Sequence, residues 1–345
     1  MIRNIELVNF RNHKKTKIKF NNNFVYIYGE NGSGKTSIIE AIYFLSTTKS
    51  FRTSEEKELI KKDQQFTKVA LKNDSDEYEI VLSKNGKRLF TNKLEIKKVS
   101  EYIGGFNVVV FALEDLNLIK GTPSDRRQFL DLELLQIDKE YLRLLNDYKK
   151  LLKQRNSLLK KLTINDDLTM LNILGNSLYE VGVKIYKKRN DYLIDLNQKI
   201  KEIYKRFSPG NIDIVYKPNL LENEFYDWVT KKQEIDIIYK TTMGGIHKDD
   251  FIIKMDNYEA KSYASNGEQR LIVIALKMAL LRQIKESNDK DTILLLDDVL
   301  SELDDDKQTT VLENIKGNEM IIITSATPCK INDNLEIIML KKGEV

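Results

Sequence analysis

The segment from residue 29 to residue 36 constrains the fold more than any other part of this chain. An apolar, strand-like run at residues 24–28 precedes it, and residues 38–45 have the apolar spacing of a helix. The segment satisfies the phosphate-loop pattern G-x-x-x-x-G-K-[ST], and its members are Gly29, Glu30, Asn31, Gly32, Ser33, Gly34, Lys35 and Thr36. In such a loop the backbone amides surround phosphate oxygens, Lys35 reaches the β and γ phosphates, and the Thr36 hydroxyl ligates Mg²⁺. The sequence therefore predicts a strand-loop-helix unit that binds ATP and Mg²⁺.

Two carboxylates follow a continuous apolar run near the end of the chain. The run covers residues 293–296, and it ends in Asp297 and Asp298. An unbroken apolar run of this length is typical of a strand buried in a parallel sheet. Such a strand would bring Asp297 beside the phosphate loop to hold Mg²⁺ through water, and Asp298 could then orient the attacking water. We therefore predict Asp297 as a metal-site residue, and Lys35, Asp297 and Asp298 as catalytic residues.

A third motif begins at Ser265 and precedes an apolar stretch with helical character. Taken alone, it is a capped helix start. It lies about 30 residues before the two carboxylates, where ABC-type ATPases carry their signature sequence, and it resembles the S-x-G-x-Q-R variant. In that class Ser265 and the backbone at Gly267 meet the γ phosphate bound by the other subunit, with the helix N-terminus as an anion site. We therefore expect Ser265, Gly267 and Gln269 to bind nucleotide in a homodimer that ATP closes.

Two further segments bear on the class of ATPase. Residues 301–304 follow the carboxylates as a D-loop would, and Thr324 ends a strand-like run where transporters place a switch histidine. That histidine is missing, and the signature is not of the L-S-G-G-Q form. An ATPase subunit of a membrane transporter is therefore a poor match.

The pattern of elements indicates an α/β fold with a helical insertion. Strand-like segments before residue 112 indicate a small antiparallel sheet over residues 66–111, and strands return near residues 212–217 and 251–255. Between them Thr122, Pro123 and Asp125 form a helix start, and apolar stripes over 141–162 and 171–203 predict two antiparallel helices. The predicted fold is an ABC-type ATPase head with a P-loop core, residues 1–118 and 207–345, and an inserted helical arm, residues 119–206, for DNA or dimer contacts.

Composition bears on where the protein is found in the cell and on the charge of its surface. The 345 residues contain one cysteine, Cys329, which excludes an internal disulfide, and no run approaches the roughly 20 apolar residues of a membrane span. We expect a cytoplasmic protein with no membrane partner. The net charge is only +4, but residues 139–206 hold 16 lysine and arginine residues against 8 acidic ones. This excess would suit binding to the phosphate backbone of DNA, although lysine-rich faces are usually only solvated.

These motifs together resemble the RecF family, whose ATPase heads are related to those of SMC proteins. The segment from Asn9 to Asn12 resembles the family's opening NFRN, and the resemblance implies that Arg11 lies near the bound phosphates. Residues 121–131 resemble its G-x-P-x-x-R-R-x-F-L-D, with Arg126 and Arg127 as the arginine pair. The family's G-P-H-R-D-D appears as residues 245–250, where His247 is kept and Lys248 replaces an arginine. Whether the arginine pair and His247 contact nucleotide, DNA or the other subunit stays open.

The resemblance also implies partners and a role. A RecF-like protein is expected to bind double-stranded, gapped or junction DNA, and to recruit recombination mediator proteins that load recombinase. ATP hydrolysis would then be slow and stimulated by DNA, and it would release DNA by reopening the dimer. The alternative that the residues leave open is a nucleotide-gated scaffold that binds proteins without contacting DNA. A chromosome-tethering protein of the SMC kind is excluded, because the helical arm is too short for a long coiled coil.

Overall fold

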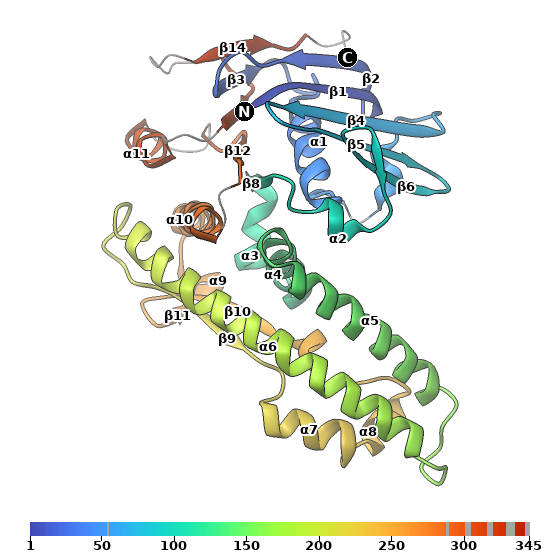
Figure 1. Cartoon of the computed structure of the whole chain (residues 1–345). Coiled ribbons are helices and arrows are strands. Elements are labelled where there is room, and N and C mark those ends of the chain that lie inside the picture. The colour runs from blue at the N-terminus through green and yellow to red at the C-terminus, as the bar shows by residue number, and fades with distance from the viewer. Residues whose placement is uncertain (54, 288–289, 301–304, 316–319, 329–334, 342–345) are drawn as a thin grey trace. The chain divides into compact units, whose positions relative to one another are not determined.

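The computed structural model describes residues 1–53, 55–287, 290–300, 305–315, 320–328 and 335–341 (Figure 1). Cys329 and the expected D-loop at 301–304 lie outside these residues. The chain forms two compact units, which we call the first unit (1–116 and 273–345) and the second unit (117–272). No helix in the described ranges is long and apolar enough to cross a membrane.

A five-stranded parallel sheet is the centre of the first unit. Its strand order is β14-β3-β13-β12-β8, and every neighbouring pair is parallel. The strands are β3 (Phe24–Tyr28), β8 (Asn107–Phe111), β12 (Thr292–Asp297), β13 (Met320–Ser325) and β14 (Glu336–Met339). β8, β12 and β13 are buried along their whole length, which explains why they read as continuous apolar runs.

A six-stranded antiparallel sheet completes the first unit. Its order is β2-β1-β4-β5-β6-β7. The strands are β1 (Ile2–Phe10), β2 (His13–Lys19), β4 (Phe66–Asn73), β5 (Glu77–Ser83), β6 (Gly86–Thr91) and β7 (Leu94–Ile96). Helix α1 (Lys35–Thr47) packs against strands of both sheets, and all but one of its residues are buried. A helix covered on all sides needs apolar residues on all sides, and α1 supplies them.

One expected strand belongs to the other sheet. Residues 107–111 were predicted as part of the small antiparallel sheet, but β8 pairs in parallel with β12. The reason is visible in the sequence, because this run has no polar-apolar alternation and all five of its residues are buried. The remaining elements of the first unit are short: η1 (Glu56–Leu59), α2 (Val99–Tyr102), η2 (Leu113–Leu116) and α11 (Asp305–Ile315).

The second unit is built on a helical hairpin. Helices α5 (Lys139–Leu159) and α6 (Thr169–Tyr204) pack against each other, as the two apolar stripes predict (Figure 1). Helix α4 (Pro123–Ile137) begins where expected, with Thr122 and Asp125 in a capping box. The other elements are α3 (Asn117–Lys120), β9 (Ile212–Lys217), α7 (Glu222–Thr230), α8 (Glu234–Tyr239), η3 (Ile246–Lys248), β10 (Asp250–Met255), β11 (Tyr258–Glu259) and α9 (Ala260–Tyr263).

The boundary between the units differs from the expected domain ranges. Residues 207–272 were assigned to the ATPase head, but they cluster with the helical arm. The three-stranded sheet β11-β10-β9 accounts for this, since β9 packs on α6 and β10 packs on α4. Helix α10 (Asn266–Ser287) starts in the second unit and continues into the first. Strand propensity alone could not assign β9 and β10 to either unit.

Candidate functional site

The parallel sheet brings the phosphate loop and the two carboxylates to one edge. The loop follows the carboxyl end of β3, Asp297 ends β12, and β13 lies between these strands. Because the strands are parallel, their carboxyl ends meet at one edge, where α/β proteins bind ligands. Asp297 lies opposite Thr324 in the β12-β13 register, and Ser325 lies opposite Tyr28 in the β13-β3 register. Segments more than 260 residues apart in sequence, exemplified by Thr36 and Asp297, are therefore neighbours in space.

The phosphate loop has the backbone conformation that its glycines allow. Gly32 and Gly34 have φ angles of 83° and 92°, in the region that favours glycine. A Cβ atom added at Gly34 would lie 2.5 Å from Nε2 of His13, so this position has no space for a side chain. His13 is fully buried, and its Nε2 lies 3.1 Å from the Gly34 carbonyl oxygen. Since a carbonyl only accepts, Nε2 carries the hydrogen and donates to the loop.

Lys35 is buried at the start of α1 and points back along the loop. Its ammonium donates to the carbonyl oxygens of Gly29 at 2.6 Å and Glu30 at 3.0 Å. Burial lowers the pKa of Lys35, and the nearby charges of Asp298 and Asp297 partly offset this effect. These contacts hold the side chain along the loop that would surround the phosphates.

Thr36 and Asp297, the two residues expected to hold Mg²⁺, are joined by a hydrogen bond. The Thr36 hydroxyl donates to Oδ1 of Asp297 across 3.0 Å, and the Thr324 hydroxyl donates to the same oxygen across 2.7 Å. This spacing suits the predicted roles, with the Thr36 hydroxyl as a direct ligand of Mg²⁺ and Asp297 one hydrogen bond away, where it can hold a water ligand. The described residues contain no cluster of three His, Cys, Asp or Glu side chains that could hold a metal ion.

The surroundings of Asp297 also shift the pKa of its carboxyl group. Burial raises the pKa of Asp297, whereas the hydrogen bonds from Thr324 and Thr36 lower it without removing the shift. The neighbouring Asp298 has a φ of 56°, unusual for a residue other than glycine, and its amide donates to the Thr324 carbonyl oxygen across 3.2 Å. Such backbone conformations persist where the surrounding structure holds them, often at active sites. Both carboxylates line the same pocket as the phosphate loop.

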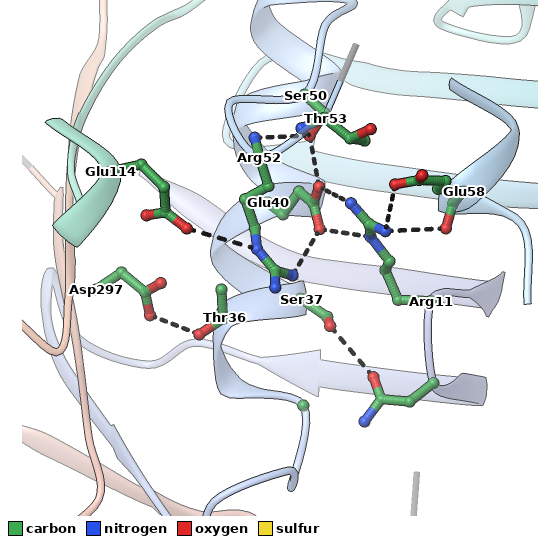
Figure 2. Close-up of polar contacts among 12 residues, drawn as sticks. Arg11, Thr36, Ser37, Glu40, Ser50, Arg52, Thr53, Glu58, Glu114 and Asp297 are labelled. Atoms are coloured by element: carbon green, nitrogen blue, oxygen red, sulfur yellow. Dashed lines mark hydrogen bonds and ion pairs between the residues drawn. The ribbon is translucent and has the colours of Figure 1, made fainter. Parts of the chain in front are cut away.

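A buried carboxylate that was not predicted from the sequence anchors two arginines beside this pocket. Figure 2 shows Arg11 and Arg52 pointing toward Glu40 of α1 from two sides. Glu40 is fully buried and accepts from Nε and Nη2 of Arg11, at 2.8 and 2.6 Å, and from Nη1 of Arg52, at 3.3 Å. The hydroxyl of Ser50 donates a fourth hydrogen bond. Arg11 thus lines the same pocket as the phosphate loop, but its guanidinium points to Glu40, and its expected place near bound phosphates stays a prediction.

The pocket at this edge is large enough for a nucleotide. Its volume is about 740 Å³, and its walls include the phosphate loop, Arg11, Arg52 and the two carboxylates. Asn12 lies in the pocket wall. Its side-chain nitrogen donates to the Gly32 carbonyl oxygen, and its side-chain oxygen accepts from the hydroxyl of Ser37. Sequence reasoning missed His13, Glu40 and Arg52 and gave no role to Asn12, because these roles depend on contacts between distant segments.

The signature segment lies in the second unit and begins helix α10. Ser265 and Gly267 are exposed, and an added Cβ at Gly267 would meet no atom within 4 Å. Ser265 and Glu268 form reciprocal hydrogen bonds, since the Ser265 amide donates to Glu268 at 2.7 Å and the Glu268 amide to the Ser265 hydroxyl at 3.3 Å. The exposed helix start suits an anion site.

Gln269 differs from its expected role in nucleotide binding. Its side chain is buried, and its amide nitrogen donates to the carbonyl oxygens of Ala264 at 2.9 Å and Ala260 at 3.2 Å. The helical position explains this, because Gln269 lies four residues after Ser265 and faces α9 rather than solvent. Gln269 therefore shapes the backbone that presents Ser265.

The arginine pair and His247 also have partners inside the second unit. Arg126 forms a two-pronged ion pair with Asp250 at 2.7 and 2.8 Å, and Arg127 donates to the carbonyl oxygen of Asp249 at 2.7 Å. His247 lies between the Tyr148 hydroxyl and the Thr242 carbonyl oxygen. These contacts join residues 121–131 to residues 245–250, which explains why the two motifs occur together. Lys248 is exposed.

Comparison with known proteins agrees with this architecture. Residues 1–343 match the family model of the RecF/RecN/SMC N terminal domain. A solved Smc head domain from Pyrococcus furiosus shares the fold, with a TM-score of 0.50 at 20% identity over 94% of this chain and 89% of that one. The fold and the site together define an ABC-type ATPase head, as the sequence predicted.

The similarity to RecF proteins is much higher. A DNA replication and repair protein RecF from Acholeplasma laidlawii is 50% identical, over 100% of this chain and 99% of its own length. One from Bacillus cereus is 40% identical, over 94% and 92%. A solved structure of the recombination mediator protein RecF-ATP in the RecFOR pathway superposes with a TM-score of 0.90 at 33% identity, covering 96% of this chain and 94% of that one. The chain belongs to the RecF family.

Proposed function

We propose that this chain is an ATPase whose two copies close over two ATP molecules and bind DNA in recombinational repair. The observation that supports it most is the meeting of Lys35, Thr36 and Asp297 at one edge of the parallel sheet. A phosphate loop and a carboxylate in this arrangement suit a nucleoside triphosphate with Mg²⁺. The RecF-ATP structure, with the same fold, supports ATP as the nucleotide.

Within each ATP site, different residues bind the phosphates, hold Mg²⁺ and orient the attacking water. Loop amides and Lys35 bind the β and γ phosphates, and Thr36 and Asp297 hold Mg²⁺, which neutralises phosphate charge when bound. Asp298 orients the attacking water, and its backbone bond to Thr324 fixes its place beside Asp297. Ser265 and the amide of Gly267 bind the γ phosphate held by the partner subunit. Closure therefore needs ATP, and hydrolysis reopens the dimer.

The DNA role draws on the relatives and on charge. The relatives are named DNA replication and repair proteins, and one is named a recombination mediator in the RecFOR pathway. The basic excess of residues 139–206 would suit phosphate-backbone binding without base readout. We propose gapped or junction DNA in the cytoplasm as the target and recombinase-loading proteins as partners. A nucleotide-gated protein scaffold without DNA contact is the alternative.

The test is fluorescence anisotropy of labelled double-stranded and gapped DNA, titrated with protein in the presence and absence of ATP and Mg²⁺. We expect ATP to tighten binding, because closure brings the DNA surfaces of two subunits together. The Ser265→Arg variant should bind ATP but lose this tightening, and Asp298→Asn should keep it while hydrolysing slowly. DNA binding that never responds to ATP would contradict the proposal and favour the scaffold.

A further inference from the structure

The solvent-facing side of α5 carries a row of basic side chains. Every member of the row is exposed, and neighbours are three or four residues apart in the chain. The row consists of Lys139, Arg143, Asn146, Lys150, Lys153, Ser157 and Lys160. Five of these seven residues are cationic and the other two are polar, while the two exposed acidic residues of α5, Glu140 and Asp147, are not members of the row. We call this set the α5 basic row.

Helix geometry places the row on a single side of α5. At about 100° per residue, its members fall within an arc of about 100°. At about 1.5 Å per residue, the row is about 32 Å long. The acidic residues of this helix lie outside the row, and Glu140 is directed to Lys188 of α6, with 2.9 Å between oxygen and nitrogen. Arg143 has its guanidinium 3.8 Å from Glu140 and a side chain that is 72% exposed.

The neighbouring helix shows that the row is not a general property of this unit. Helix α6 is longer and is also partly exposed, but its exposed charges are of both signs. Its exposed charged residues are Glu180, Lys184, Lys187, Asp191 and Glu202. A mixed face of this kind is the usual solubilising surface, whereas a row of one sign attracts a polyanion. Helix α5 holds six basic residues against two acidic ones and so carries half of the basic excess of residues 139–206, whereas the exposed charges of α6 sum to no positive excess.

We propose that the α5 basic row binds the phosphate backbone of duplex DNA. The row is about as long as one turn of B-form DNA, about 34 Å, so it can reach phosphates of both strands where their backbones cross one side of the duplex. Asn146 and Ser157 can donate hydrogen bonds to phosphate oxygens between them. Five row cations that neutralise five phosphates release the counterions condensed there, so each row that contacts the duplex should contribute about -4.5 to the slope of log K against log salt concentration. Contacts of this kind do not read sequence. This inference rests on the proposed DNA role.

Matched lysine pairs on the two helices test the inference. Lys150→Gln/Lys153→Gln removes two charges from the row, and Lys184→Gln/Lys187→Gln removes two exposed charges from α6. Binding of a labelled duplex is measured by anisotropy over a range of KCl concentrations, with ATP and Mg²⁺ present. For each row that contacts the duplex, the α5 pair should reduce the salt slope by about 1.8 and weaken binding about 60-fold at 0.1 M salt, while the α6 pair leaves both nearly unchanged. ATP-dependent dimerisation of both variants, measured by light scattering, confirms that they are folded.

The outcomes separate this inference from the proposed function. If the unaltered protein binds duplex DNA and the α5 pair has the same slope and affinity, the DNA surface lies elsewhere and the inference is wrong. The same conclusion follows if the α6 pair weakens binding as much as the α5 pair. If the unaltered protein binds no DNA at any salt concentration, the proposed DNA role itself is wrong, and the row has no duplex to bind.

Discussion

The hydroxyl of Thr36 donates to Oδ1 of Asp297 across 3.0 Å, and this contact joins the first turn of α1 to the carboxyl end of β12. The Thr324 hydroxyl donates to the same carboxylate oxygen from β13. Asp297 is therefore positioned by two hydroxyls before any cation binds. The proposed Mg²⁺ site thus depends on side-chain oxygens from helix α1 and strands β12 and β13, which the fold of the parallel sheet brings together.

Thr36→Val should remove the metal-binding hydroxyl while keeping the shape of the side chain. We expect Mg²⁺-dependent ATP hydrolysis to fall by about 100-fold, because phosphate charge is then poorly neutralised. Thr36→Ser keeps the hydroxyl and should retain most of the activity. The measurement is steady-state hydrolysis over a range of Mg²⁺ concentrations. Equal activity in the valine and serine variants would show that Thr36 does not ligate the cation.

Glu40→Gln should weaken ATP binding without altering the chemical step. The substitution removes the charge that anchors Arg11 and Arg52 beside the pocket, so we expect KM for ATP to rise about tenfold and kcat to change little. Glu58→Gln is the matched control, because Glu58 is exposed and its carboxylate lies 3.7 Å from Arg11. Thermal melting of both variants checks folding. A fall in kcat at constant KM would contradict a positioning role.

Arg189→Met should destabilise the second unit. The Arg189 side chain is 2% exposed and forms ion pairs with Asp131 at 2.8 Å and Asp249 at 3.4 Å. Removing one partner of a buried ion pair costs about 3 to 5 kcal/mol, because the remaining charges lose their partner. Trp228, the only tryptophan, lies in this unit and reports its unfolding by fluorescence in urea. Arg143→Met, on the exposed face of α5, should cost about 0.5 kcal/mol or less.

His247 should make the second unit less stable in acid. Burial lowers the pKa of His247 below its ordinary value of 6.5, so the folded protein keeps the ring neutral where the unfolded chain protonates it. Protons then favour the unfolded chain, and stability should fall as the pH drops below 6.5. Relative to His247→Gln, stability should show an added loss toward low pH, with a slope of at most about 1.4 kcal/mol per pH unit. Urea unfolding followed by Trp228 fluorescence measures it, and parallel curves for the two proteins would refute the assignment.

Local motifs predicted the parts of the site that depend on neighbouring residues. Lys35 and Thr36 follow from the phosphate-loop spacing, and Asp297 follows from the apolar run before it. The partners of these residues did not follow, because Glu40 meets Arg11 and Arg52 only after β1, α1 and the loop beyond α1 pack together. His13 gave no signal, since its role under Gly34 depends on the β1-β2 turn lying below the loop.

For some residues, the sequence motif was recognised but the contacts of the side chain were not predicted. Arg126 and His247 were recognised as members of family patterns, but a pattern does not say what a side chain contacts. The structure gives Arg126 a partner in Asp250, and places His247 between Tyr148 and Thr242. Gln269 was grouped with Ser265 for the same reason, although its position on α10 turns it inward. Burial, which decides these cases, depends on tertiary packing.

In the proposed dimer, each ATP is bound by Lys35 of one subunit and Ser265 of the other. Mixing two inactive variants tests this shared site. Lys35→Met and Ser265→Arg are each made in the Asp298→Asn background, which slows hydrolysis, and the molar mass with ATP and Mg²⁺ is measured by light scattering. Alone, each variant should remain a monomer, since neither can form a complete site. Mixed, they should form dimers, because Lys35 of the Ser265→Arg chain meets Ser265 of the Lys35→Met chain and restores one site. Dimers of Ser265→Arg alone, or no dimers in the mixture, would contradict the shared site.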